Sequence, residues 1–143
     1  MLAQQGDARF ASGCMLYWAE GARHRNKVTF VNSDPEMVRF FVRFLRTYWR
    51  VNDSDFTVAC NLFADHIEHQ REIEQFWLDV AGLPAGCLRR STVNTYSKYS
   101  KKKRRNKLPY GTCRVEVCRT RIAQAIYGAI QEIGGFTRDA WLE

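Results

Sequence analysis

The sequence predicts an α+β domain in which helices cover one face of a mainly antiparallel sheet. Apolar residues recur with a helical period in several segments. Between them lie short runs in which apolar and polar residues alternate, the pattern of strands that are buried on one face. The chain has 143 residues, enough for a hydrophobic core. We therefore expect residues 1–143 to form a single domain.

The first expected helix covers residues 8–19 and ends in an unusual way. Glu20 follows the apolar run, and Gly21 follows Glu20. A glycine at this point predicts a left-handed C-cap. A carboxylate in the last helical turn lies beside the negative end of the helix dipole, which is unfavourable. The position of Glu20 therefore indicates a functional role.

A hairpin and a second helix are expected next. Residues 27–32 alternate as a strand, with Arg25 and Asn26 in the turn before it. Ser33 and Glu36 have the spacing of a capping box at the start of the helix. Its apolar side chains repeat at helical spacing: Met37, Phe41, Phe44, Leu45 and Tyr48. On the opposite face we expect a solvated stripe of Arg39, Arg43, Arg46 and Arg50.

The rest of the chain predicts further strands and two more helices. In chain order the expected elements are strand 55–63, helix 65–80, strand 87–95, strand 112–119 and helix 120–133. Residues 96–111 form a basic loop before the last strand, and residues 134–143 form either a last helix or a tail. The outward face of the sheet is expected to carry Lys27, Thr29, Thr57, Asn61, Arg114 and Glu116. Such a face either stays in solvent or reads base edges in a DNA major groove.

The net charge of +7 is concentrated in one segment. Between Val80 and Arg114 there are ten Lys and Arg and no acid. The usual partner of such a field is phosphate, with a solvated linker as the alternative. The expected nucleic-acid contacts are Lys27 and Thr29 on the sheet, followed by Arg89, Arg90, Lys98, Lys101, Lys102, Lys103, Arg104, Arg105, Lys107 and Arg114.

The five cysteines are scattered and odd in number, which favours free, buried thiols in a reducing compartment. We expect a cytoplasmic protein, associated with the nucleoid in a prokaryote. No apolar run reaches the length of a membrane span, so no membrane partner is expected. The alternative use of cysteine is a zinc site, but the spacing that structural zinc requires is absent from Cys113, Cys118, His66 and His69.

One side of the first helix is bulky and the other is small. The small side permits close approach of a second backbone, for which the candidate is the same helix of another copy about a two-fold axis. Packing within its own domain is the alternative. The residues expected at the dimer interface are Ala8, Ala11, Ser12, Met15 and Ala19.

The stretch "MLYWAEG", the hairpin after it and "NSDPEMVRFFVRFL" resemble the LAGLIDADG homing endonuclease family. Residues 13–21 occupy the nine motif positions, and Ala19, Glu20 and Gly21 match the end of the motif. The resemblance implies a homing-endonuclease-like fold and a homodimer built on the motif helices. It also implies sheets that lie on double-stranded DNA as a saddle, and a divalent metal, Mg²⁺, held at the scissile phosphates by Glu20 beside Gly21.

The activity that this resemblance implies is hydrolysis of DNA phosphodiesters, with Glu20 as the catalytic, metal-binding carboxylate. Lys107 and Arg114 are candidates for assisting basic residues, by charge and by nearness to a strand. Met15 stands where the motif usually has glycine, and this favours the alternative of a non-catalytic DNA-binding protein or transcriptional regulator with the same fold. A third hypothesis is RNA binding, in which bases stack on Tyr96, Tyr99 and Tyr110.

Overall fold

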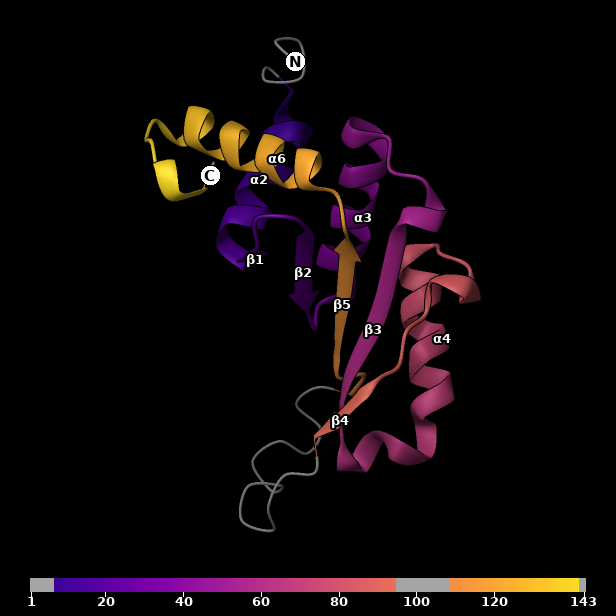
Figure 1. The fold of residues 1–143 in the computed structure, drawn as a ribbon. Helices are drawn as coiled ribbons and strands as arrows, with labels where there is room; N and C mark the ends of the chain where they lie inside the picture. The colour runs from indigo at the N-terminus through magenta and orange to yellow at the C-terminus, as the bar shows by residue number, and fades with distance from the viewer. Residues whose placement is uncertain (1–6, 95–108, 142–143) are drawn as a thin grey trace.

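The computed structural model describes residues 7–94 and 109–141 (Figure 1). Its helices are α2 (Ala8–Glu20), α3 (Pro35–Trp49), α4 (Gln70–Ala81) and α6 (Thr120–Gly134). Its strands are β1 (Gly21–Arg23), β2 (Val28–Asn32), β3 (Phe56–Phe63), β4 (Thr92–Asn94) and β5 (Thr112–Val117). Short 3-10 turns lie at Asp53–Asp55, Ala64–His69, Ala85–Cys87 and Asp139–Trp141. The predicted α+β class is confirmed.

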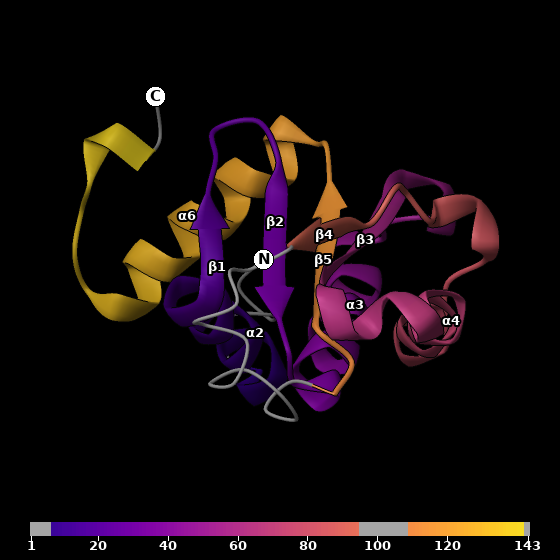
Figure 2. The ribbon, with the colours of Figure 1, turned by 90° about the horizontal axis from the view of Figure 1, so that it is seen from below.

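The strands form one mixed sheet in the order β1-β2-β5-β3-β4 (Figures 1 and 2). The β1–β2, β2–β5 and β5–β3 pairs are antiparallel, whereas β4 runs parallel to β3. The predicted strand at 87–95 is too long at its start, because β4 begins at Thr92; residue 95 lies outside the described residues. The 3-10 turn Ala85–Cys87 takes up the first predicted residue, and Leu88 forms an isolated bridge with Val58.

The core lies between one face of the sheet and the helices. The side chains of Val28, Phe30, Val58 and Val115 are at most 1% exposed. Burial alternates along β5 as predicted, whereas in β2 Thr29, on the other face, is also buried at 4% exposure. Phe41 of α3 stacks on Phe30, with ring centroids 4.6 Å apart. The helices therefore cover one face, and the other face of the sheet keeps its polar side chains.

Gly21 is not the left-handed cap that the sequence predicts. Its φ of −80° and ψ of 155° are extended, and its N–H donates to the Tyr17 carbonyl, so β1 begins directly at the end of α2. A Cβ at this position would lie 2.4 Å from Tyr17 Cδ1 and 2.6 Å from the Tyr17 oxygen. Glycine is required here for the close approach of the helix end to the strand.

Two helix starts differ from the prediction. Asp34, not Ser33, is the N-cap of α3, because its side chain accepts a hydrogen bond from Glu36 N at 2.9 Å. The helix predicted at 65–80 begins at Gln70, and residues 64–69 form a 3-10 turn. His66 explains this turn, since its Nδ1 accepts from Phe63 N at 2.9 Å.

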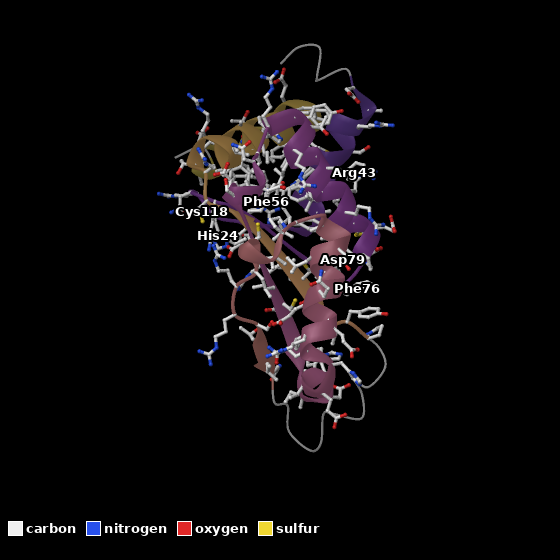
Figure 3. The ribbon with its side chains drawn as sticks, turned by 90° about the vertical axis from the view of Figure 1, so that its right-hand side faces the viewer. His24, Arg43, Phe56, Phe76, Asp79 and Cys118 are labelled. Carbon is white, nitrogen blue, oxygen red and sulfur yellow. The ribbon has the colours of Figure 1, made fainter. Side chains whose placement is uncertain are left out.

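The arginine stripe on α3 is solvated only in part. Arg46 bridges α3 to the end of α4, donating to the Ala81 and Gly82 carbonyls at 3.2 and 2.7 Å. It also forms an ion pair with Asp53 at 2.8 Å. Figure 3 shows the side of the molecule on which α3 and α4 lie next to each other, with the exposed Arg43 labelled. One residue of the predicted solvent face thus holds the two helices together.

Gly13 tests the packing of α2 against α3. A Cβ on Gly13 would lie 2.1 Å from Phe44 Cδ1, whereas a Cβ on Gly128 of α6 would meet nothing within 4 Å. Gly13→Ala should lower the free energy of unfolding by about 1–3 kcal/mol through overpacking. The control, Gly128→Ala, should raise it by up to about 1 kcal/mol through helix propensity. Urea unfolding of both variants measures this, and equal effects would contradict the contact.

Candidate nucleic-acid interface

The polar face of the sheet has the composition that the sequence predicts. Thr29 and Thr57 are register partners of Glu116 from either side, which puts the three residues in one row across β2, β5 and β3. Val31 and Ala59 flank Arg114 in the next row. The face is thus mainly polar, with small apolar side chains between its charged groups.

Glu116 organises the charges on this face. Its Oε2 accepts from Thr29 Oγ1 at 2.8 Å and pairs with Lys27 Nζ at 2.9 Å, and its Oε1 lies 3.6 Å from Arg114 Nε. Burial, the largest single influence, raises the pKa of Glu116. The hydrogen bonds from Lys27 and Thr29 and the charges of Lys27 and Arg114 outweigh burial, so the pKa lies below its usual value. Both predicted cationic contacts of the sheet are therefore held by one carboxylate.

A second polar group lies toward the other end of β3. Asn61 Nδ2 donates to Thr112 Oγ1 at 3.1 Å, and Asn61 Oδ1 accepts from Thr92 Oγ1 at 2.7 Å. These bonds orient the amide of Asn61 between β4 and β5. The described strands on either side of 95–108 meet at this group, since Thr92 of β4 and Thr112 of β5 are both register partners of Asn61.

Glu20 is exposed at the end of α2. Among the described residues its carboxylate makes neither a hydrogen bond nor an ion pair. No basic residue lies in the last turn of the helix. The carboxylate therefore faces the negative end of the helix dipole without local compensation, as the sequence indicates.

Glu20 is the one metal ligand that the sequence predicts, and the described residues around it add no ligand cluster. Within residues 7–94 and 109–141, no group of three or more His, Cys, Asp or Glu side chains has the arrangement to hold a metal ion. Mg²⁺ is commonly bound by one or two carboxylates together with water and phosphate oxygens. Glu20 fits such a site only if a second copy and the substrate supply the other ligands.

The two sides of α2 differ in exposure as the dimer hypothesis requires. Phe10, Cys14 and Tyr17 are at most 2% exposed in the core. The five small-side residues are exposed or half-exposed: Ala8, Ala11, Ser12, Met15 and Ala19. Met15 packs against the core, whereas Ala8, Ser12 and Ala19 are exposed, so packing within the domain accounts for only part of this side. The second copy itself remains a prediction.

The structure brings together only part of the basic set. Lys27, Thr29 and Arg114 share the sheet face, whereas Arg89 and Arg90 are exposed before β4, at the other edge of the sheet. Arg89 Nη1 donates to the Gly86 and Leu88 carbonyls at 2.9 and 3.2 Å. The remaining predicted contacts lie outside the described residues: Lys98, Lys101, Lys102, Lys103, Arg104, Arg105 and Lys107, as do Tyr96 and Tyr99.

The cysteines are free thiols, four of them buried and Cys118 exposed. Burial raises the pKa of Cys60 to about 11, so the thiol is protonated at neutral pH. Cys113 is buried and Cys118, which follows β5, is exposed, and the described residues hold no cluster of three or more potential metal ligands. His66 is buried and His69 is exposed.

The structure also shows a pocket that the sequence did not predict. A cavity of about 420 Å³ lies between the 3-10 turn at Ala64–His69, α4 and Tyr110. Its lining includes the carboxylates Asp65 and Glu72 and both histidines. These carboxylates repel phosphate. The pocket therefore does not extend the candidate interface, and the residue spacing could not reveal it because Tyr110 arrives from a distant part of the chain.

Comparison with protein-family models, curated proteins and solved structures found no match for this chain. In the described part of the chain, no helix is long and apolar enough to cross a membrane.

The charge pairs of Glu116 predict a pH dependence of stability. Because folding lowers its pKa, ionised Glu116 stabilises the fold above its ordinary value of 4.5, and this contribution is lost as the pH falls through the lower folded value. Glu116→Gln should lower the free energy of unfolding by about 1 kcal/mol at pH 7. The difference from wild type should shrink below pH 4.5.

Urea unfolding between pH 3 and pH 7 measures the effect. Lys27→Met, which removes one partner, should reduce the same pH dependence. Parallel curves for wild type and Glu116→Gln over this range would contradict the assignment.

Proposed function

We propose that this chain binds duplex DNA as a homodimer and hydrolyses its phosphodiester bonds with Mg²⁺, as the resemblance to LAGLIDADG homing endonucleases implies. The observation that carries the proposal is the exposed, unpaired Glu20. It ends a helix whose exposed side is small and is followed directly by a strand of the sheet. The proposed dimer contact, the carboxylate and the sheet proposed to face DNA thus follow one another along the chain.

The position of Glu20 relative to the sheet supports this function. Gly21 pairs with Phe30, and Phe30 pairs with Val115, so Arg114 lies one register step farther, toward the same end as Glu20. The two positions are separated by two strand spacings, about 10 Å. A phosphate bound between them would be within reach of both side chains. Among the described residues, Arg114 is therefore the candidate for stabilising charge on the phosphate.

The chemistry requires two copies. Two Glu20 carboxylates that approach each other about a two-fold axis repel, and a divalent cation removes this repulsion. Bound Mg²⁺ would stabilise charge on the phosphate and supply an activated water. The residues of the chain orient the DNA: the hydroxyl and amide groups of the sheet hold base edges, and its cations hold the backbone.

A non-catalytic DNA-binding regulator is the second candidate, and one observation favours it. Lys27 and Arg114, the cationic residues of the described sheet face, are both held by Glu116. Neither is free to donate to a scissile phosphate unless that contact opens. DNA binding without cleavage would then be the function, and Glu20 would lie at the dimer contact without chemistry.

Glu20→Gln separates the two candidates. Cleavage of duplex DNA in the presence of Mg²⁺ should fall by at least about 100-fold, the scale expected when a charge-stabilising group is removed. DNA affinity should be retained, and the melting temperature should not fall, since the substitution removes an unfavourable charge at the helix end. The control is Glu72→Gln on α4, whose side chain is 82% exposed.

Cleavage assays on a library of duplex targets and binding assays on the same library give both readouts. Cleavage that persists in Glu20→Gln contradicts the role of Glu20. Binding by wild type without nicking on any target favours the regulator.

Ser12→Arg tests the dimer. Ser12 is exposed on the small side of α2, where a long cation prevents close approach of a second helix. Wild type should sediment at twice 16.7 kDa and the variant at 16.7 kDa. Ser54→Arg, on the exposed turn before β3, should remain dimeric. An unchanged sedimentation of Ser12→Arg would contradict the proposed interface.

A further inference from the structure

The chain beyond α6 folds back onto α2 as an aromatic cluster. Phe136 stacks on Trp18 of α2, with ring centroids 4.9 Å apart. Trp141 contacts Tyr127 of α6 and Phe136, with centroids 5.7 Å away in both pairs. In the described part of region 134–143, which the sequence left open as a helix or a tail, the chain therefore forms a short 3-10 turn, Asp139–Trp141, packed against the domain.

A buried glutamine fixes the backbone of this segment. Gln131 is 6% exposed, and its Oε1 accepts from Arg138 N at 2.5 Å while its Nε2 donates to the Tyr127 carbonyl at 3.2 Å. The Gln131 carbonyl also accepts from Phe136 N at 3.0 Å. These bonds hold Arg138 in one place on the surface before any ligand arrives.

Two arginines share the ring of Trp141. The guanidinium carbon of Arg23, at the end of β1, lies 4.9 Å from the ring centroid, and that of Arg138 lies 4.8 Å from it. Arg23 Nη2 also donates to the Trp18 carbonyl at 3.3 Å. Both residues are exposed, and neither forms an ion pair with a carboxylate in the part of the chain that the structure describes.

Arg138 also lies 5.1 Å from the Phe136 ring centroid and so has a packing role, but packing does not require Arg23 on the same Trp141 ring. One cation–π contact would suffice to hold Trp141, while a second guanidinium on the same ring adds repulsion between like charges. Since the two guanidinium carbons lie 4.9 and 4.8 Å from one centroid, they are at most 9.7 Å apart, and an oxyanion that binds both would offset their repulsion. Guanidinium groups present forked donors that match phosphate oxygens, and stacking on an aromatic ring keeps those forks in position.

We infer that Arg23 and Arg138, held on Trp141, form a phosphate-binding site at the β1 edge of the sheet. Arg23 is the register partner of Val28, whose side chain faces the core, so the Arg23 side chain leaves the β1 edge on the helix-covered side of the sheet and not on the polar face. The site therefore suits contact with backbone and not with base edges. This inference rests on the proposed function in one respect: the phosphate would be a phosphodiester of duplex DNA that lies on the polar face and reaches past the β1 edge.

The first experiment is a titration of the full chain with inorganic pyrophosphate, followed by NMR of the arginine Nε–H and tryptophan Nε1–H groups. The signals of Arg23, Arg138 and Trp141 should shift together and saturate. The shifts should be lost in Arg138→Gln and weakened in Arg138→Lys, which keeps the charge but lacks the planar fork. The control, Arg43→Gln on the helix side of the molecule (Figure 3), should titrate like wild type.

The second experiment measures duplex DNA affinity as a function of salt. Arg138→Gln should reduce the slope of log affinity against log salt by about one, and Arg23→Gln with Arg138→Gln by about two. Thermal unfolding of each variant checks that the aromatic cluster is intact, and Arg43→Gln should leave the slope unchanged.

The outcomes separate this site from the proposed function. Pyrophosphate binding without DNA binding by wild type supports an anion site for free phosphate compounds and contradicts the DNA function. DNA binding with an unchanged salt slope in the double variant contradicts the backbone contact. Absence of saturable pyrophosphate shifts overturns the site.

Discussion

The position of Glu20 depends on Tyr17. The Tyr17 hydroxyl donates to the Ala22 carbonyl at 2.6 Å and accepts from Thr29 N at 3.1 Å, so one side chain of α2 bonds to both β1 and β2. Its ring stacks on Phe41 of α3, with centroids 5.3 Å apart. Burial raises the pKa of Tyr17 far above its usual range, which keeps the hydroxyl a donor. The helix end, the hairpin and α3 are therefore locked to each other by one residue.

These contacts of Tyr17 determine which side of α2 faces outward. Because Tyr17 and Cys14 must face the core, the residues on the opposite side of the helix, such as Ser12 and Ala19, are left on the surface. The same geometry brings Gly21 against the Tyr17 ring and removes room for a connecting loop. Glu20 is then held at the junction of helix and strand, and any partner that covers the outer side of α2 would also cover this carboxylate.

Much of this arrangement follows from sequence pattern. The apolar period of residues 8–19 and the alternation of 112–117 assign the core face of α2 and β5 correctly, because in both cases burial alone decides which side chain points inward. The pattern failed where side-chain hydrogen bonds compete with periodicity. His66 converts the expected helix start into a 3-10 turn, and Asp34 takes the cap from Ser33. The requirement for glycine at position 21 is steric, because a Cβ there would meet the ring of Tyr17, four residues earlier.

The candidate site also combines features that local sequence pattern predicts with features that it does not. Glu20 and the sheet face were predictable, because a helix end and strand alternation are local properties. The coupling of Lys27, Arg114 and Glu116 was not, because it depends on the register between β2 and β5. The arginine pair on Trp141 was also beyond local pattern, since its residues come from β1 and from beyond α6.

Charge neutralisation on the sheet sets how the described surface can meet DNA. Glu116 offsets one of the two charges of Lys27 and Arg114, so the polar face supplies oriented hydroxyl and amide groups with reduced net attraction for phosphate. In the proposed complex, sequence-independent attraction would also come from cations outside this face, and Arg23 and Arg138 are two such residues at the β1 edge. Base reading and backbone holding would thus rest on different residues, and each can be altered without the other.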